Sequence, residues 1–74
     1  FAVQVIQNIQ HLGVNPDKVN IGGGGIALGH PIGGSGTRVL VTLLHHMKRT
    51  SAKRGIVTLC LGGGNAVSML LERD

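Results

Sequence analysis

The chain has 74 residues and a formal net charge of +4; 42% of its residues are hydrophobic, nearly all of them aliphatic, and it holds 13 glycines and one cysteine. A single core in a chain this short supplies only about 3–5 kcal/mol, and one cysteine excludes a disulfide framework that would compensate. The lack of aromatic residues beyond Phe1 removes the platform for stacking single-stranded bases, and no apolar run approaches the roughly 20 residues that cross a bilayer. We therefore expect part of a larger α/β body, in a compartment that keeps thiols reduced.

Residues 1–12 are predicted to form an amphipathic helix. Apolar side chains recur at helical spacing and make one stripe, while amides and His11 occupy the opposite face. Gly13 suits the position just after a helix, and Pro16 prevents the helix from continuing. The stripe consists of Ala2, Val5, Ile6, Ile9 and Leu12.

A turn is expected over residues 15–20, where Asn, Pro and Asp favour tight backbone. Residues 19–28 are predicted to be extended and interrupted by glycine, a poor strand by propensity. If this segment is a strand, the four glycines from Gly22 to Gly25 must lie against another backbone or a ligand.

A second helix is predicted over residues 35–50, with Ser35 as its N-cap. Its apolar stripe is continuous, and the basic residues lie mostly off that stripe. His45 and His46 are adjacent in sequence, so they point in different directions and are not expected to share a metal ion. The stripe consists of Val39, Leu40, Leu43, Leu44 and Met47.

Two strands complete the chain. Residues 55–61 form a short, continuous apolar run that is typical of a strand buried on both faces. Three glycines and Asn65 follow, and residues 66–72 form a second apolar strand, so that a hairpin is the natural pairing. We find no repeat and no linker, and the order of elements predicts an α/β fold at the edge of a layered domain.

Two residues are candidates for chemistry. His30 lies in the glycine-rich stretch from Gly22 to Gly36, and Pro31 fixes φ beside the imidazole. Cys60 precedes three glycines at a strand end. It is either a buried structural cysteine or a thiol facing a pocket in which backbone N–H groups converge on an oxyanion.

Nucleotide-binding motifs do not fit. Ser35 stands where a P-loop requires lysine. A lenient dinucleotide pattern fails because no helix can continue through Gly29 and Pro31.

The two glycine-rich stretches together resemble the C-terminal end of a thiolase, of the kind found in acetyl-CoA acetyltransferases and 3-ketoacyl-CoA thiolases. The resemblance covers essentially the whole chain. Ketoacyl synthases have a histidine where Cys60 stands, and sterol-carrier-type thiolases lack this Cys-x-Gly-Gly-Gly ending. The matching residues are Asn20, Gly23-Gly24, Ala27-Leu28-Gly29-His30-Pro31, Gly33, Ser35-Gly36, Leu59-Cys60 and Gly62-Gly63-Gly64.

The resemblance implies a thioester Claisen condensation and its reverse, with residues 1–74 as the C-terminal part of a thiolase C-terminal domain. His30 matches the histidine that activates a nucleophilic cysteine from the N-terminal half and stabilises the thioester enolate. Cys60 matches the second cysteine, which removes or returns the α-proton. Gly62 matches the glycine whose N–H helps to bind the tetrahedral oxyanion. Gly22 and Gly25 replace the Asn and Ala common in the family, which bears on substrate size.

The resemblance also implies a set of partners. The substrate is a CoA thioester and no cofactor is required. The remainder of the thiolase subunit supplies the nucleophile, an asparagine and the segment that grips CoA. A homo-oligomer, dimer or tetramer, is expected in the cytoplasm, with the mitochondrion or peroxisome as alternatives, and neither nucleic acid nor membrane is a partner. Biosynthetic and degradative roles both stay open.

An alternative of another class is a non-catalytic basic fragment that binds an anionic partner. Four of the seven cations fall between Lys48 and Arg54, and such clusters bind phosphates. The same cations also suit a helix C-terminus and a solvated turn.

Overall fold

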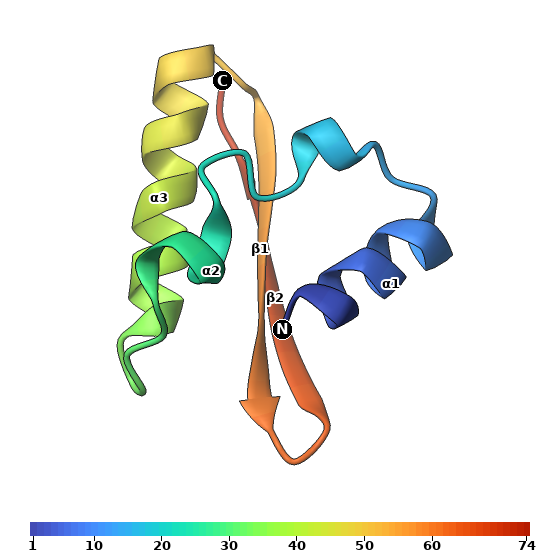
Figure 1. The fold of residues 1–74 in the computed structure, drawn as a ribbon. Helices are drawn as coiled ribbons and strands as arrows, with labels where there is room; N and C mark the ends of the chain where they lie inside the picture. The colour runs from blue at the N-terminus through green and yellow to red at the C-terminus, as the bar shows by residue number, and fades with distance from the viewer. The chain divides into compact units, whose positions relative to one another are not determined.

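A computed structural model describes all 74 residues, which divide into two compact units, residues 1–30 and residues 31–74 (Figure 1). Helices occupy the first unit. The second unit holds one long helix and an antiparallel hairpin, so the predicted α/β class is confirmed. No helix has the combination of length and apolar character that would let it cross a membrane. The two units are described separately below.

The first unit begins with α1, Ala2–Leu12, the predicted amphipathic helix. Its C-cap is Gly13, which takes the left-handed conformation at φ 66° and donates its N–H to the carbonyl of Ile9 at 3.0 Å. This is the geometry for which glycine is preferred at that position. The predicted turn follows as a short 3₁₀ helix, Pro16–Lys18, in which the Asn15 side chain accepts from the N–H of Asp17 at 3.0 Å.

The prediction of an extended segment over residues 19–28 is wrong in its second half, where α2, Gly24–Leu28, forms one short helix. Asn20 and Gly23 both have positive φ, and the N–H of Gly23 donates to the carbonyl of Asn20 at 2.8 Å. A Cβ on Gly24 would lie 2.9 Å from Cγ of Asn20. The glycines therefore allow a tight turn that packs against the Asn20 side chain. This local packing outweighs the low helix propensity of glycine.

The second unit opens with α3, Ser35–Thr50, which has the predicted bounds. The predicted N-cap is wrong by one residue: Gly34 is the N-cap, and Ser35 is the first helical residue. The Ser35 hydroxyl donates to the carbonyl of Pro31 at 3.3 Å, whereas an N-cap hydroxyl accepts from a backbone N–H in the first turn of the helix. The helix ends at Thr50, and its C-cap is Ser51, a non-glycine residue with φ 58°.

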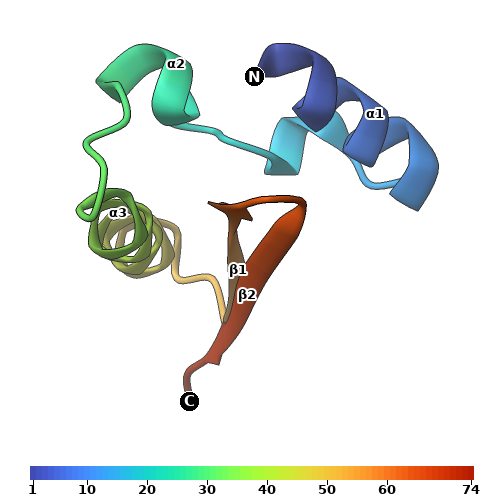
Figure 2. The same cartoon turned by 90° about the horizontal axis from the view of Figure 1, so that it is seen from below.

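The hairpin consists of β1, Arg54–Gly62, and β2, Asn65–Glu72, paired antiparallel as predicted. Figure 2, which looks nearly along α3, shows this helix beside the hairpin. Burial alternates along β1: Gly55, Val57 and Leu59 are half-buried, whereas Ile56, Thr58 and Cys60 are exposed. The prediction of a strand buried on both faces is therefore wrong within this chain, because α3 covers only one face.

α3 and β1 come close together at Gly55. A Cβ there would lie 2.6 Å from Cδ1 of Leu43 and 3.0 Å from Sδ of Met47. Met47, 4% exposed, is the buried hydrophobic residue of the chain. The absence of a side chain at Gly55 thus lets the helix approach the strand closely.

Candidate active site

His30 lies in the first unit, directly after the end of α2. Gly29 is the C-cap of that helix, with φ 86° and ψ 179°, and it donates its N–H to the carbonyl of Gly25 at 2.7 Å. The positive φ is a conformation that L side chains rarely adopt. Glycine at this position therefore sets the direction of the chain between the end of α2 and His30. The His30 side chain is exposed.

Cys60 lies in the second unit, at the outer end of β1 and opposite Ala66 of β2. Its thiol is free and exposed, so the expectation of a buried structural cysteine does not describe this chain. The residue belongs to the exposed face of the hairpin, together with Ile56, Thr58 and their partners on β2.

Gly62 is brought into direct contact with Cys60. The strand register slips between these two residues, which leaves Leu61 without a partner on β2. Gly62 has φ 88°, and its N–H donates to Sγ of Cys60 at 3.2 Å. The bulge thus folds one backbone donor onto the sulfur, an arrangement that strands achieve by inserting one extra residue. An oxyanion role for the same N–H stays a prediction.

A hydroxyl pair lies beside Cys60 on the same face of the hairpin. Ser68 donates its hydroxyl hydrogen to Oγ1 of Thr58 at 2.8 Å, and the Thr58 hydroxyl donates to the carbonyl of Val67 at 3.2 Å. Such cross-strand pairs stabilise sheets. The bonds hold β1 and β2 together two residues before the candidate thiol. The sequence pattern gave no signal for them.

The turn that follows His30 contains a second feature that sequence analysis did not find. Ser35 was expected to cap α3, yet it is buried, at 7% exposed, and is tied to Pro31. Serine is common at the start of a helix, so its presence there does not predict whether the side chain is buried.

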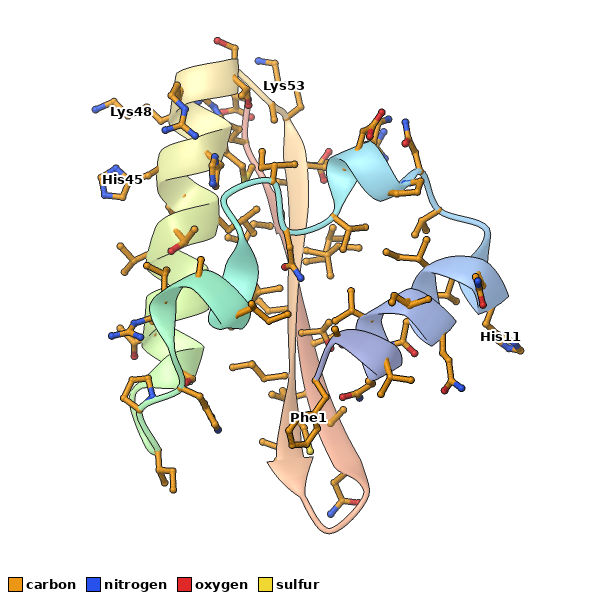
Figure 3. All side chains as sticks on the ribbon, in the orientation of Figure 1. Phe1, His11, His45, Lys48 and Lys53 are labelled. Atoms are coloured by element: carbon orange, nitrogen blue, oxygen red, sulfur yellow. The ribbon has the colours of Figure 1, made fainter.

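The cationic cluster surrounds the C-terminal end of α3, as Lys48 and Lys53 show in Figure 3. Lys48 and Arg49 lie in the last helical turn, where cations interact favourably with the helix dipole. Arg49 also contacts Nδ1 of His46, and the N–H of Arg73 donates to the carbonyl of Lys53 at 2.9 Å. Binding of an anionic partner by this cluster stays a prediction, and salt-dependent retention on DNA would measure it.

Comparison with known proteins supports the resemblance seen in the sequence. Residues 1–73 match the family described as "Thiolase, C-terminal domain". Curated relatives include an acetyl-CoA acetyltransferase of Chromobacterium violaceum, 59% identical over 99% of this chain and 19% of its own length. The cytosolic acetyl-CoA acetyltransferase of Mus musculus is 58% identical over 99% of the chain and 18% of its own length. The Escherichia coli acetyl-CoA acetyltransferase is 52% identical with the same coverage.

The chain spans less than a fifth of the length of these curated relatives. No solved structure matches it. The family match nevertheless covers nearly every residue of the chain. The chain therefore belongs to the thiolase family, and residues 1–73 match the C-terminal domain of that family.

Proposed function

We propose that this chain supplies part of the active site of a thiolase subunit, which transfers acyl groups between thioesters. The reaction is the condensation of two acetyl-CoA molecules to acetoacetyl-CoA and CoA, together with the reverse cleavage. The observation that carries the proposal is identity of 52–59% to proteins named acetyl-CoA acetyltransferase over nearly the whole chain. Residues 1–74 act as the C-terminal part of the domain, and the rest of the subunit supplies the nucleophilic cysteine.

Each candidate residue has a distinct task in the proposed reaction. His30 activates the nucleophile, which takes the acyl group from the first thioester, and then stabilises the enolate of the second. Cys60 removes the α-proton that creates this enolate, or returns it in the reverse direction. The Gly62 N–H helps to bind the negatively charged oxygen of the tetrahedral intermediate.

The geometry at the end of β1 supports this division of tasks. Exposure of the Cys60 thiol gives a substrate access to it. The 3.2 Å bond from the Gly62 N–H to Sγ places a donor and a candidate base within one small volume. The base acts at the α-carbon and the Gly62 donor at the oxygen of the tetrahedral intermediate, and these two atoms are separated by one carbon once the new carbon–carbon bond has formed.

The test separates the two cysteines in the complete subunit. Cys60→Ala should still let the nucleophilic cysteine take an acetyl group from acetyl-CoA, because that step needs no base at the α-carbon. Exchange of deuterium into the methyl group of acetyl-CoA should fall to the uncatalysed rate, because alanine accepts no proton. Formation of the acetyl-enzyme, followed by intact mass, serves as the internal control for folding.

Two outcomes would contradict the assignment. Exchange at nearly the wild-type rate would make another group the base and leave Cys60 with a structural role. Loss of acetylation in a folded variant would show that Cys60 also acts in the first step. The CoA thioester as substrate and a homo-oligomeric assembly belong to the same proposal, and sedimentation of the complete subunit measures the assembly.

A further inference from the structure

The Gly62 N–H has an acceptor in the structure that differs from the acceptor it has in the proposed reaction. In the structure it donates to Sγ of Cys60 at 3.2 Å. In the proposed reaction it binds the negatively charged oxygen of the tetrahedral intermediate. An N–H group directs its one hydrogen along one line, and a hydrogen bond weakens steeply as the angle at that hydrogen closes. The Gly62 N–H therefore cannot serve the sulfur and the oxygen well at the same time.

The backbone fixes the direction of this N–H, and the sulfur is the partner that can move. The strand register slips between Cys60 and Gly62, and Gly62 has φ 88°, so the peptide group belongs to a bulge of defined geometry. The Cys60 thiol is exposed, and its side chain turns between staggered rotamers about a single bond. Rotation of one side chain is thus enough to release the N–H.

Sulfur is suited to be a partner that leaves. A thiol sulfur is a weak hydrogen-bond acceptor, whereas a hydroxyl oxygen offers two lone pairs. An oxygen that carries a negative charge is a stronger acceptor than either, because such charge-assisted bonds are roughly twice as strong as neutral ones. The Gly62 N–H therefore favours the substrate oxygen over the sulfur once charge develops on that oxygen.

We propose that the Cys60 sulfur holds the Gly62 N–H before the reaction and yields it to the oxygen of the tetrahedral intermediate, so that the same event frees the Cys60 side chain to turn. This inference rests on the proposed function, because it links the tasks given there to Cys60 and Gly62. The competing explanation is that the bond only stiffens the tip of the hairpin, with no exchange of partners.

The experiment compares the rate of acetyl-enzyme formation in the complete subunit for Cys60→Ala and Cys60→Ser. Alanine has no acceptor, so the N–H is free for the substrate. A serine hydroxyl accepts from the backbone N–H two residues further on, as in ST turns, and does not leave as readily as sulfur. Ala66→Ser is the matched control, because Ala66 is exposed and lies opposite Cys60 on β2. Thermal unfolding of each variant confirms that it is folded at the assay temperature.

A second measurement follows the bond directly. The amide proton of Gly62 is observed by NMR in the complete subunit, labelled with ¹³C at the leucine carbonyls and ¹⁵N at glycine, so that only Leu–Gly pairs such as Leu61–Gly62 give signals. Its signal should move upfield in Cys60→Ala, which removes the acceptor. It should move downfield in Cys60→Ser, which supplies a better one. An unmoved signal in Cys60→Ala overturns the inference, because the sulfur then holds no N–H to yield.

If the N–H exchanges partners, Cys60→Ser takes up the acetyl group about 2- to 10-fold more slowly than Cys60→Ala, the range that corresponds to one ordinary hydrogen bond. Ala66→Ser then retains the wild-type rate. Equal rates for the two Cys60 variants, or an equal slowing by Ala66→Ser, would overturn the inference. An unmodified subunit that takes no acetyl group would instead overturn the proposed function.

Discussion

Two glycine-to-alanine substitutions in the second unit are expected to change stability in opposite directions. Gly55 and Gly36 both lack a positive φ, so alanine is compatible with the backbone at either position. Such a replacement ordinarily stabilises a protein by about 0.4–1 kcal/mol, because it reduces the entropy of the unfolded chain. The surroundings of the added methyl group then decide the sign.

At Gly55 the methyl group would lie 2.6 Å from Cδ1 of Leu43 and 3.0 Å from Sδ of Met47. The first distance is about 1 Å shorter than an optimal carbon–carbon contact. Overpacking of this kind costs about 1–3 kcal/mol, and Met47 has little room to move because it is only 4% exposed. After the entropic gain, we expect Gly55→Ala to lower the free energy of unfolding by about 1–2 kcal/mol.

Gly36 is the matched control, because its added methyl group would meet only Cδ1 of Leu59, at 4.0 Å. Gly36 lies inside α3, so we expect Gly36→Ala to raise the free energy of unfolding by about 0.5–1 kcal/mol. Urea unfolding of the complete subunit, at one fixed protein concentration, measures both changes. Leu43→Ala should offset part of the loss in Gly55→Ala. Equal shifts of the same sign for Gly55→Ala and Gly36→Ala would refute the packing argument.

Three further predictions concern the candidate histidine His30, the C-terminal end of α3 and the isolated chain. In the complete subunit, His30→Ala should slow acylation and condensation by about 10²–10³-fold each, the typical cost of losing an oxyanion donor; normal acylation in stopped-flow measurements would exclude a dual role. Ser51→Gly should stabilise the subunit by about 1 kcal/mol, because Ser51 has φ 58° at the C-cap of α3; an unchanged urea midpoint would show that the cap is not strained. The isolated 74 residues should not cleave acetoacetyl-CoA, because Cys60 is their only cysteine, and measurable CoA release would contradict the proposed need for a second one.

The sequence predicted the elements that depend on periodic side chains. The apolar spacing of residues 1–12 and 35–50 predicts two helices and the glycine-rich connection predicts a hairpin, and the structure contains all three elements. α2 could not be found in this way, because its sequence is rich in glycine and carries no apolar stripe. That helix depends on a turn folded over Asn20, a contact that no propensity scale describes.

In the candidate site too, sequence composition revealed some features, and others became visible only in the structure. His30 and Cys60 could be found because their glycine-rich surroundings are unusual in composition. The bond from the Gly62 N–H to the Cys60 sulfur depends on a register slip in the hairpin. The burial of Ser35 depends on a turn of five residues closed onto one carbonyl. Both bonds join a side chain to the backbone across a local turn, and residue types alone do not predict the turn geometry that brings the partners together.

The three glycines at the hairpin tip have a consequence for protein chemistry. Gly62, Gly63 and Gly64 have φ values of 88°, 64° and 85°, the region that mirror-image amino acids prefer. A D-alanine would therefore occupy any of these positions without the strain that an L-alanine suffers. An L-Cβ at each would meet no atom within 4 Å, so backbone strain and not crowding disfavours an L side chain there. The backbone conformation of the tip thus favours residues of the opposite hand, and we expect a semisynthetic subunit with D-alanine at position 63 to have a stiffer loop beside Cys60.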